Sequence, residues 1–515
     1  MIPSPEIHVG AVLPLLAVAG GAFLLLVLDL LLAGAPRYKG TVLSLASAAT
    51  LALTLAIACA GFAAGGSPEF SPAHPMFQLD RLANFGVAVI AMGALLSVLL
   101  STYYLREVGI DYGEYYVLLL LATSGMVLLV GAVDLVTVFL GIELLSIPIY
   151  VLAGFDRRKL RSNESALKYF LAGSFASALM LYGMALLYGA TGETSYSGIA
   201  GYFAENLLGP LALIGLGLVL VGFTFKISSV PFHQWTPDVY EGAPAAVTAY
   251  MSVTVKAAAF VALVRLAVAT FGPVEGPLTN VLWWLAAATM VLGNLMAVIQ
   301  DNVKRMLAYS SVAHAGYLLI GLVAASPGAY GEAFAAVLFY LLAYAFTNLG
   351  AFGVVVALAH NGQDAERFEE YAGLAKRRPA LAALMTLFLI SLAGIPGTAG
   401  FIGKFLIFSA AVERGLATGG SALIVLVVIA VLNSAISLGY YLRVVATMYF
   451  HPAREDARPG RAGFFESAVL FACAAAVLLL GLLPQDALPG ISSLLQMADV
   501  NVLQLASDAA ATLGP

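Results

Sequence analysis

The chain has 515 residues, of which 61% are hydrophobic and only 10% are charged, whereas an ordinary soluble domain carries about 25% charged residues. This composition excludes a soluble globular protein and indicates an integral membrane protein. The formal net charge of -5, without any basic cluster, gives no indication of a nucleic-acid partner.

Apolar runs long enough to cross a bilayer recur along almost the whole chain. We count about fourteen such runs, since a helix needs roughly 20 apolar residues to cross the hydrocarbon core. They are centred near Leu24, Leu51, Ile90, Leu121, Glu143, Leu179, Leu216, Lys256, Thr289, Leu318, Tyr344, Ala393, Val431 and Ala475. Continuous runs, rather than short alternating segments, predict an all-α membrane protein. No basic residue precedes the first run, so we expect it to remain as a span rather than to be a cleaved signal.

Basic residues collect in the loops after runs 1, 3, 5, 9, 11 and 13. These loops contain Arg37, Lys39, Arg106, Arg157, Arg158, Lys159, Arg161, Lys304, Arg305, Arg367, Lys376, Arg377, Arg378, Arg454, Arg458 and Arg461. The alternate loops contain only Arg414. Because Lys and Arg favour the cytoplasmic face, we predict a multi-pass membrane protein with both termini on the side away from the cytoplasm.

Two of the runs contain a proline beside a lysine. Pro231 follows Lys226 in run 7, and Pro396 precedes Lys404 in run 12. A proline removes a backbone donor and clashes with the preceding turn, so both helices are expected to break. Corresponding breaks in two halves of a chain are typical of transporters with inverted repeats. Ordinary kinks are the alternative explanation.

The breaks suggest four segments. We predict a three-helix segment over residues 1–110, a first five-helix repeat over 111–272, a second and inverted repeat over 273–450, and a last helix with a tail over 451–515. The second repeat would be inverted because five is an odd number of spans.

Four charged residues lie deep within the apolar runs: Glu143, Lys226, Lys256 and Lys404. A charge at the bilayer centre costs at least about 2.5 to 3.5 kcal/mol on insertion scales, so such residues usually mark ion or proton pathways. A buried lysine can exchange its proton, and a carboxylate near a cation can control that exchange. The alternative is a static ion pair or a protonated hydrogen bond that holds two helices together.

Three further residues are weaker candidates. Lys168 enters run 6 from the basic side and either reaches toward Glu143 or extends to the aqueous interface. His233 follows the break of run 7, and His314 lies well inside run 10. Imidazole suits a proton relay, although a lone buried histidine is often a hydrogen-bonding core residue. Tyr440 and Tyr441 are interpreted as packing residues.

Several long motifs resemble the antiporter-like membrane subunits of respiratory complex I, and within them the N-type group. They are FHQWTPDVYEGAPAAVT (232–248), DNVKRMLAYSSVAHAGY (301–317), YAGLAKRRP (371–379) and AGIPGTAGFIGK (393–404). The resemblance covers essentially the whole chain. A lysine at position 404 disfavours the M-type group, and the end of the chain soon after run 14 disfavours the L-type group.

This resemblance implies a fourteen-helix fold and a role in proton translocation by an NADH:quinone oxidoreductase. Glu143 and Lys226 would be a coupled pair with Lys168 as its neighbour, Lys256 a central relay, and Lys404 the outlet-side lysine. His233 and His314 would belong to the polar axis between them. K-type and M-type membrane subunits would be the neighbours in the complex.

The chain itself would bind no redox cofactor, and NADH, FMN, iron–sulfur clusters and quinone would belong to other subunits of the complex. Its two cysteines, Cys59 and Cys473, both lie in apolar runs and offer no metal or iron–sulfur motif. Three alternatives stay open: a subunit of a multisubunit cation/proton antiporter, the counterpart in a photosynthetic complex, and a structural subunit with an inactive channel.

Overall fold

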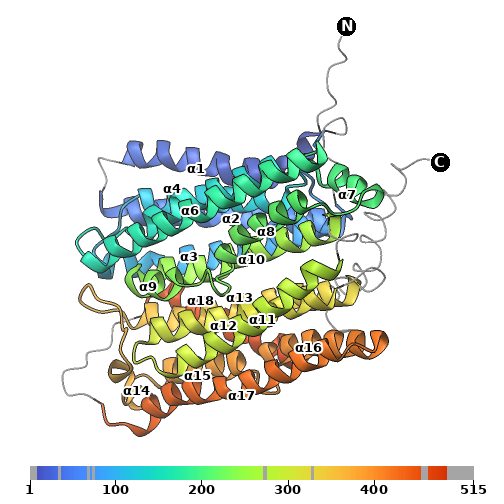
Figure 1. Cartoon of the computed structure of the whole chain (residues 1–515). Helices are drawn as coiled ribbons and strands as arrows, with labels where there is room; N and C mark the ends of the chain where they lie inside the picture. Colours follow the sequence, from blue (N-terminus) through green and yellow to red (C-terminus); the bar gives the residue numbers. More distant parts are fainter. Residues whose placement is uncertain are drawn as a thin grey trace.

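In a computed structural model the chain folds into a bundle of helices that run side by side, from α1 at one edge to α17 at the other (Figure 1). The structure describes residues 8–32, 36–66, 70–71, 76–270, 275–325, 330–453 and 462–483. Its long helices are α1 (Leu13–Leu31), α2 (Pro36–Ala63), α3 (Arg81–Val108), α4 (Glu114–Gly131), α5 (Leu135–Ala153), α6 (Leu160–Thr191), α8 (Pro210–Lys226), α10 (Ala245–Thr270), α11 (Glu275–Val298), α12 (Val303–Ala324), α13 (Tyr330–Ala357), α15 (Pro379–Ala393), α16 (Ala399–Thr418), α17 (Ser421–Phe450) and α18 (Phe464–Leu482). The shorter ones are η1 (Val9–Val12), α7 (Tyr196–Glu205), α9 (Trp235–Gly242), η4 (Phe368–Tyr371) and α14 (Leu374–Arg377).

The described helices confirm the all-α membrane fold. Twelve of them are long and apolar enough to cross a membrane, and two shorter apolar helices are Pro210–Lys226 and Pro379–Ala393. These two shorter helices are α8 and α15, which begin the two spans that were predicted to break. Residues 454–461, with three of the basic residues used to predict the topology, and the tail after residue 483 lie outside the described part.

Span 7 breaks directly after Lys226. Helix α8 ends there, residues 227–234 form turns, and α9 continues from Trp235. Pro231 cannot donate a backbone hydrogen bond, so other groups must satisfy the carbonyls that the break frees. The Trp235 indole N–H donates to the Phe225 carbonyl at 3.2 Å, and the Ser229 N–H donates to the Thr224 carbonyl at 2.8 Å. The carbonyls of Phe225 and Thr224, which the break frees, therefore have donors inside the protein.

Span 12 breaks between α15 and α16. Gly394 ends α15 in the left-handed region with φ 85°, and Gly397 follows with φ 86°. A residue with a side chain is strained in this region, which explains why glycines flank Pro396 here. Helix α16 then begins at Ala399 and carries Lys404 in its second turn.

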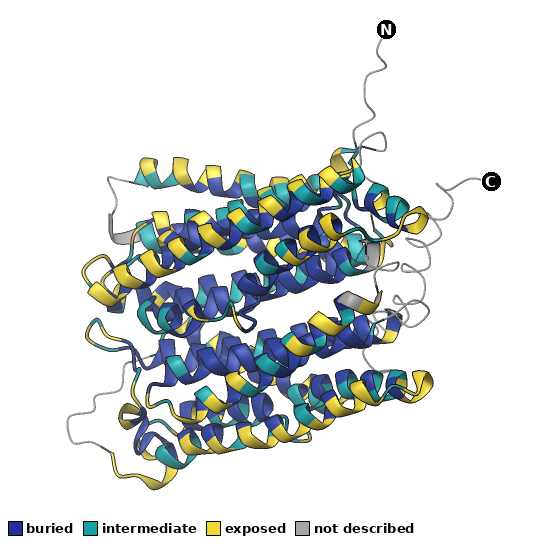
Figure 2. Cartoon of the chain, viewed as in Figure 1, coloured by how far each residue is buried: buried dark blue, intermediate teal, exposed yellow. Residues whose placement is uncertain are grey.

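Burial differs sharply between helices. The most apolar 18-residue windows of α10 and α12 are 100% buried within the protein, whereas those of α1 and α17 are only 28% buried (Figure 2). Helices α10 and α12 therefore contact protein on all sides, and α1 and α17 present most of their apolar surface outward. Polar side chains on α10 and α12 are consequently surrounded by protein groups that can bond to them, rather than by lipid.

The loops rich in basic residues meet at one end of the bundle. Arg158 donates to the Val108 carbonyl at 2.9 Å, and both Arg161 and Lys304 lie 3.6 Å from Glu366. Helices α9 and α14 lie at this same end (Figure 1). We call this region, residues 106–114, 154–161, 299–305 and 358–378, the basic end. The clustering agrees with the predicted topology, while the compartment that it faces stays a prediction.

Candidate functional site

Lys226 lies at the end of α8, where the span breaks, and is 3% exposed. Its ammonium group donates to the Ser146 hydroxyl of α5 at 2.6 Å. The rings of Tyr150, Tyr169 and Phe225 surround it at 5.3 to 5.7 Å from the ring centroids. Aromatic faces attract a cation, more strongly where water is excluded. This site can therefore hold a charged lysine without a carboxylate in direct contact.

Glu143 lies three residues before Ser146 on α5, so the two side chains share one face of the helix. Glu143 is half-buried, and its Oε1 atom is buried without a hydrogen-bond partner among the described residues. Lys226 bonds to Ser146 and not to this carboxylate. The coupling of Glu143 with Lys226 stays a prediction. In the structure, the group that Lys226 contacts directly is the Ser146 hydroxyl.

Lys168 lies at the basic end rather than beside Glu143. Its ammonium group pairs with Asp238 at 2.6 Å and with Glu164, one turn earlier on α6, at 2.7 Å. The side chain is 45% exposed. Of the two alternatives from the sequence, the structure favours the extension of this lysine toward the aqueous interface.

Lys256 lies in α10 and donates to both the carbonyl and the hydroxyl of Ser311 in α12, with 2.6 Å to the hydroxyl. The Tyr344 hydroxyl donates to the same Ser311 oxygen at 2.9 Å, and its ring centroid lies 5.6 Å from the lysine nitrogen. Lys256 is 2% exposed. The proton of this lysine therefore lies nearest to Ser311, whose hydroxyl is bonded in turn to the Tyr344 hydroxyl.

His314 lies one turn beyond Ser310 and Ser311 on α12. Its Nδ1 is 2.5 Å from the Tyr340 hydroxyl, and its Nε2 is 3.2 Å from the Tyr441 hydroxyl. Tyr441 in turn lies 2.5 Å from the Ser310 hydroxyl. Hydroxyls and imidazole can each donate and accept, so this row is capable of passing a proton along α12. The sequence indicated only a packing role for Tyr441, and the structure adds a hydroxyl that links His314 to Ser310.

Lys404 occupies the break of span 12. Its ammonium group donates to the Ala393 carbonyl at 3.0 Å and to the Ser434 hydroxyl at 2.9 Å. Ala393 is the last residue of α15, so its carbonyl lacks an intrahelical partner. The nitrogen also lies 4.8 Å from the Tyr317 ring, which packs edge-on against His314 with 5.6 Å between centroids. Lys404 and His314 are therefore neighbours across a single aromatic ring.

The structure thus assembles a polar axis along α10, α12, α16 and α17, formed by Lys256, Ser311, Ser310, Tyr441, His314 and Lys404. His233 is not joined to this axis by a hydrogen bond within the described residues. It lies half-buried in the turn after α8, and its buried Nδ1 atom has no hydrogen-bond partner there. The role predicted for His233 stays a prediction. No three His, Cys, Asp or Glu side chains of the described residues come together to hold a metal ion.

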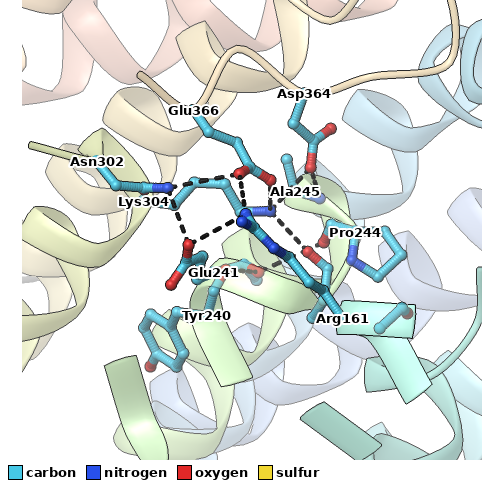
Figure 3. Close-up of polar contacts among 12 residues, drawn as sticks. Arg161, Tyr240, Glu241, Pro244, Ala245, Asn302, Lys304, Asp364 and Glu366 are labelled. Carbon is cyan, nitrogen blue, oxygen red and sulfur yellow. Dashed lines mark hydrogen bonds and ion pairs between the residues drawn. The ribbon is translucent and has the colours of Figure 1, made fainter. Parts of the chain in front are cut away.

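The sequence analysis missed a second group of polar residues at the basic end (Figure 3). Arg305 of α12 pairs with Asp238 at 2.7 Å and with Glu241 at 2.9 Å, both on α9. Lys304 pairs with Asp364 at 2.8 Å. A cavity of about 410 Å³ opens beside them, lined by Asp364, Glu366, Glu241 and Arg161 among others. The second half of broken span 7 is therefore held by ion pairs from α12.

These residues gave weak signals in the sequence. Lys304 and Glu241 lie inside the conspicuous motifs, but Lys304 was used there only to predict topology. Asp364 lies in a polar loop with three other acidic residues nearby, Glu366, Glu369 and Glu370, and nothing local distinguishes it. Only the tertiary fold brings it to Lys304 and to Tyr104.

The Lys304–Asp364 pair predicts a pH dependence of stability. Burial raises the pKa of Asp364, but the charge and hydrogen bond of Lys304 and the hydrogen bond of Tyr104 outweigh burial, so this pKa lies below the ordinary 3.8. A carboxylate with a lowered folded-state pKa stabilises the protein above about pH 4, and this contribution is lost as the pH falls through the folded-state pKa. The melting temperature should therefore fall less steeply below about pH 4 in Asp364→Asn than in the unchanged protein. Tryptophan fluorescence of the detergent-extracted protein measures this, and equal pH profiles would contradict it.

Comparison with known proteins places this geometry in a family. Residues 132–436 match the family described as "NADH:quinone oxidoreductase/Mrp antiporter, TM". NADH-quinone oxidoreductase subunit N of Trichlorobacter lovleyi is 48% identical over 406 residues, which cover 78% of this chain and 81% of that protein. Subunit N of Myxococcus xanthus is 41% identical over 506 residues, covering 92% and 94%.

Solved structures agree with the sequence relatives. A chain of respiratory complex I from Thermus thermophilus with bound aureothin is 34% identical, with a TM-score of 0.76 over 93% of this chain and 99% of that one. A chain of the Mrp complex from Dietzia has a TM-score of 0.82 over 98% of this chain and all of that one, at 24% identity, which shows a shared fold. The chain therefore belongs to the NADH:quinone oxidoreductase/Mrp antiporter membrane family, and within it to subunit N of NADH-quinone oxidoreductases.

Proposed function

We propose that this chain moves protons within the membrane part of an NADH:quinone oxidoreductase and takes no part in the redox chemistry itself. The observation that carries the proposal is the polar axis: Lys256, His314 and Lys404 are buried and are linked by hydroxyl and aromatic groups. Buried ionisable residues in a membrane protein are costly, and they usually mark an ion or proton pathway. NADH, FMN, iron–sulfur clusters and quinone would be bound by other subunits.

The proposed route begins at Lys226 and passes through Lys256 and His314 to Lys404. Weakening of the electrostatic interaction between Glu143 and Lys226, driven by quinone reduction elsewhere in the complex, would release the proton of Lys226. Ser146 would then keep the lysine side chain in position while its charge changes. Moving one charge against 100 mV requires about 2.3 kcal/mol, which the redox reaction must supply for each proton.

The two broken spans support a pair of inverted repeats. Breaks after Lys226 and before Lys404 fall in the fourth helix of each proposed five-helix unit, residues 111–272 and 273–450. Each break carries a buried lysine with a serine partner, Ser146 and Ser434 respectively. The two halves would thus provide similar proton-binding sites at the two ends of the proposed route. We further propose that K-type and M-type subunits adjoin the chain in the inner membrane, with both termini on the periplasmic side.

The first test is to tag the chain in its native membrane, extract the complex in mild detergent and measure inhibitor-sensitive NADH:quinone reductase activity. We expect the activity to comigrate with the tag. A subunit of a cation/proton antiporter would instead exchange cations for protons without NADH or quinone. If the tag comigrates with an activity that oxidises a different electron donor and not NADH, the proposal is contradicted.

A further inference from the structure

The joint between α9 and α10 is held by side chains from distant parts of the chain (Figure 3). Ala243 and Pro244 connect the two helices, and α10 begins at Ala245. The Lys304 ammonium group donates to the Ala243 carbonyl at 2.7 Å. The Ala245 N–H donates to the Tyr104 hydroxyl at 2.9 Å and to Asp364 at 3.1 Å. Both sides of the joint are therefore bonded to groups outside α9 and α10.

Asp364 is the centre of this arrangement. It accepts hydrogen bonds from Lys304 at 2.8 Å, from the Tyr104 hydroxyl at 2.7 Å, and from the first N–H of α10. The side chains of Lys304 and Asp364 are 1% and 4% exposed, and Tyr104 is 1% exposed. These groups come from α12, from the loop after α13 and from α3. Buried charge-assisted hydrogen bonds are short and directional, so they fix relative positions well.

The same two helices meet again deeper in the protein. Helix α10 carries Lys256 eleven residues after Ala245, and α12 carries Ser311 seven residues after Lys304. Lys256 donates to Ser311. An α-helix of this length is a stiff rod with a rise of about 1.5 Å per residue. A shift at the start of α10 relative to α12 is therefore transmitted to the Lys256–Ser311 contact.

We propose that Lys304, Asp364 and Tyr104 form a positioning site, the α10 clasp, that sets the register of α10 against α12 and so keeps Lys256 bonded to Ser311. The clasp residues do not carry the transported proton. The inference rests on the proposed function, because the contact that the clasp maintains is a step of the proton route. The competing explanation is that these residues only satisfy one another's buried charges.

Two variants separate these explanations. Lys304→Met removes the donor to Ala243 and leaves Asp364 as a buried charge with one partner fewer, which is strongly destabilising in general. The double variant Lys304→Met/Asp364→Asn removes both charges, so no buried charge is left unpaired, but the Ala243 carbonyl still lacks its donor. Charge satisfaction alone predicts that the double variant behaves like the unchanged complex. The clasp predicts that it does not.

The measurement is the number of protons translocated per NADH oxidised, in vesicles that contain the whole complex, with assembly checked by native gel electrophoresis. We expect the ratio of the assembled double variant to be about half that of the unchanged complex or lower. An effect of this size is typical of residues that couple two sites through their positions. Asp111→Asn, which removes the partner of Arg106 elsewhere at the basic end, should keep the full ratio. If Lys304→Met does not assemble, the double variant alone decides.

A normal ratio in the double variant overturns the clasp, and so does its failure to assemble, since the residues would then be needed for folding alone. Lys256→Ala is measured in parallel. A reduced ratio in Lys256→Ala with a normal ratio in the double variant overturns the clasp and leaves the proton route intact. A normal ratio in Lys256→Ala overturns the proposed route itself, and the clasp with it.

Discussion

Replacing Lys256 by Ala is expected to stop proton translocation while the complex still assembles and oxidises NADH with an artificial electron acceptor. Lys256 is the buried amine at the start of the polar axis, bonded to Ser311 and facing the Tyr344 ring. Alanine leaves these hydroxyls without a group that can bind and release a proton at this depth. Removing a positioned acid–base group slows a proton transfer by about 10²-fold or more. Translocation by this route should fall to the background of the assay.

The measurement is the quench of a pH-sensitive dye in membrane vesicles during NADH oxidation, corrected for the amount of assembled complex. Lys256→Arg is a second informative variant, because a guanidinium keeps the positive charge but does not release its proton. The Lys256→Arg complex should not pump protons if Lys256 must release its proton. It should pump normally if only the positive charge is needed. The matched control is Lys39→Ala, which removes a partly exposed lysine paired with Asp29 at 3.0 Å and should pump normally. Full pumping by assembled Lys256→Ala would refute the route.

The fold was predictable because its causes are local. A run of about 20 apolar residues spans a bilayer whatever its neighbours are, and Pro231 and Pro396 break their helices through backbone chemistry that depends on a few adjacent residues. The short helix α7 was not predicted as a separate element. It begins where the Ser195 hydroxyl caps its first turn by accepting from the Gly198 N–H at 3.1 Å, a signal that the sequence analysis did not use.

The site was predictable only in part, for a different reason. A charge inside an apolar run is conspicuous in a sequence, and this identified Lys226, Lys256 and Lys404 as buried residues. Serine hydroxyls in membrane helices are common and usually bond to their own backbone, so Ser311 gave no signal. Tyr441 gave none either, because a tyrosine in an apolar run is typical of packing. The direction of a long side chain was also hidden: Lys168 fits both alternatives until its partner Asp238 is placed.

Contacts between distant residues account for the rest. Tyr104 and Asp364 are 260 residues apart in the chain and 2.7 Å apart in the fold. A periodicity or motif within one segment of the sequence does not indicate that two such distant residues are in contact. The basic residues correctly predicted that their loops lie together at one end of the protein. The acidic residues that neutralise them come from other loops and from α9, where a carboxylate is common and gives no signal.

Replacing Tyr441 by Phe is expected to slow proton translocation by about 10²-fold without affecting assembly. The substitution keeps the ring and removes the hydroxyl that lies between Ser310 and His314. The His314 ring would keep its contact with Tyr340 but lose its link toward Ser310 and Ser311. A proton arriving from Lys256 would then lack the hydroxyl that bridges Ser310 and the imidazole.

The neighbouring Tyr440 supplies a matched control on the same helix. Its hydroxyl donates to Asn294 at 3.0 Å and not to the histidine, and the centroid of its ring lies 4.4 Å from that of Tyr441. Tyr440→Phe removes the same number of atoms from an equally buried ring, so both variants should lose similar stability. Only Tyr441→Phe should lose pumping, measured as the initial rate of dye quench per assembled complex. Equal pumping rates in the two variants would show that protons reach His314 by a path that avoids Tyr441, and would leave packing as the role of both tyrosines.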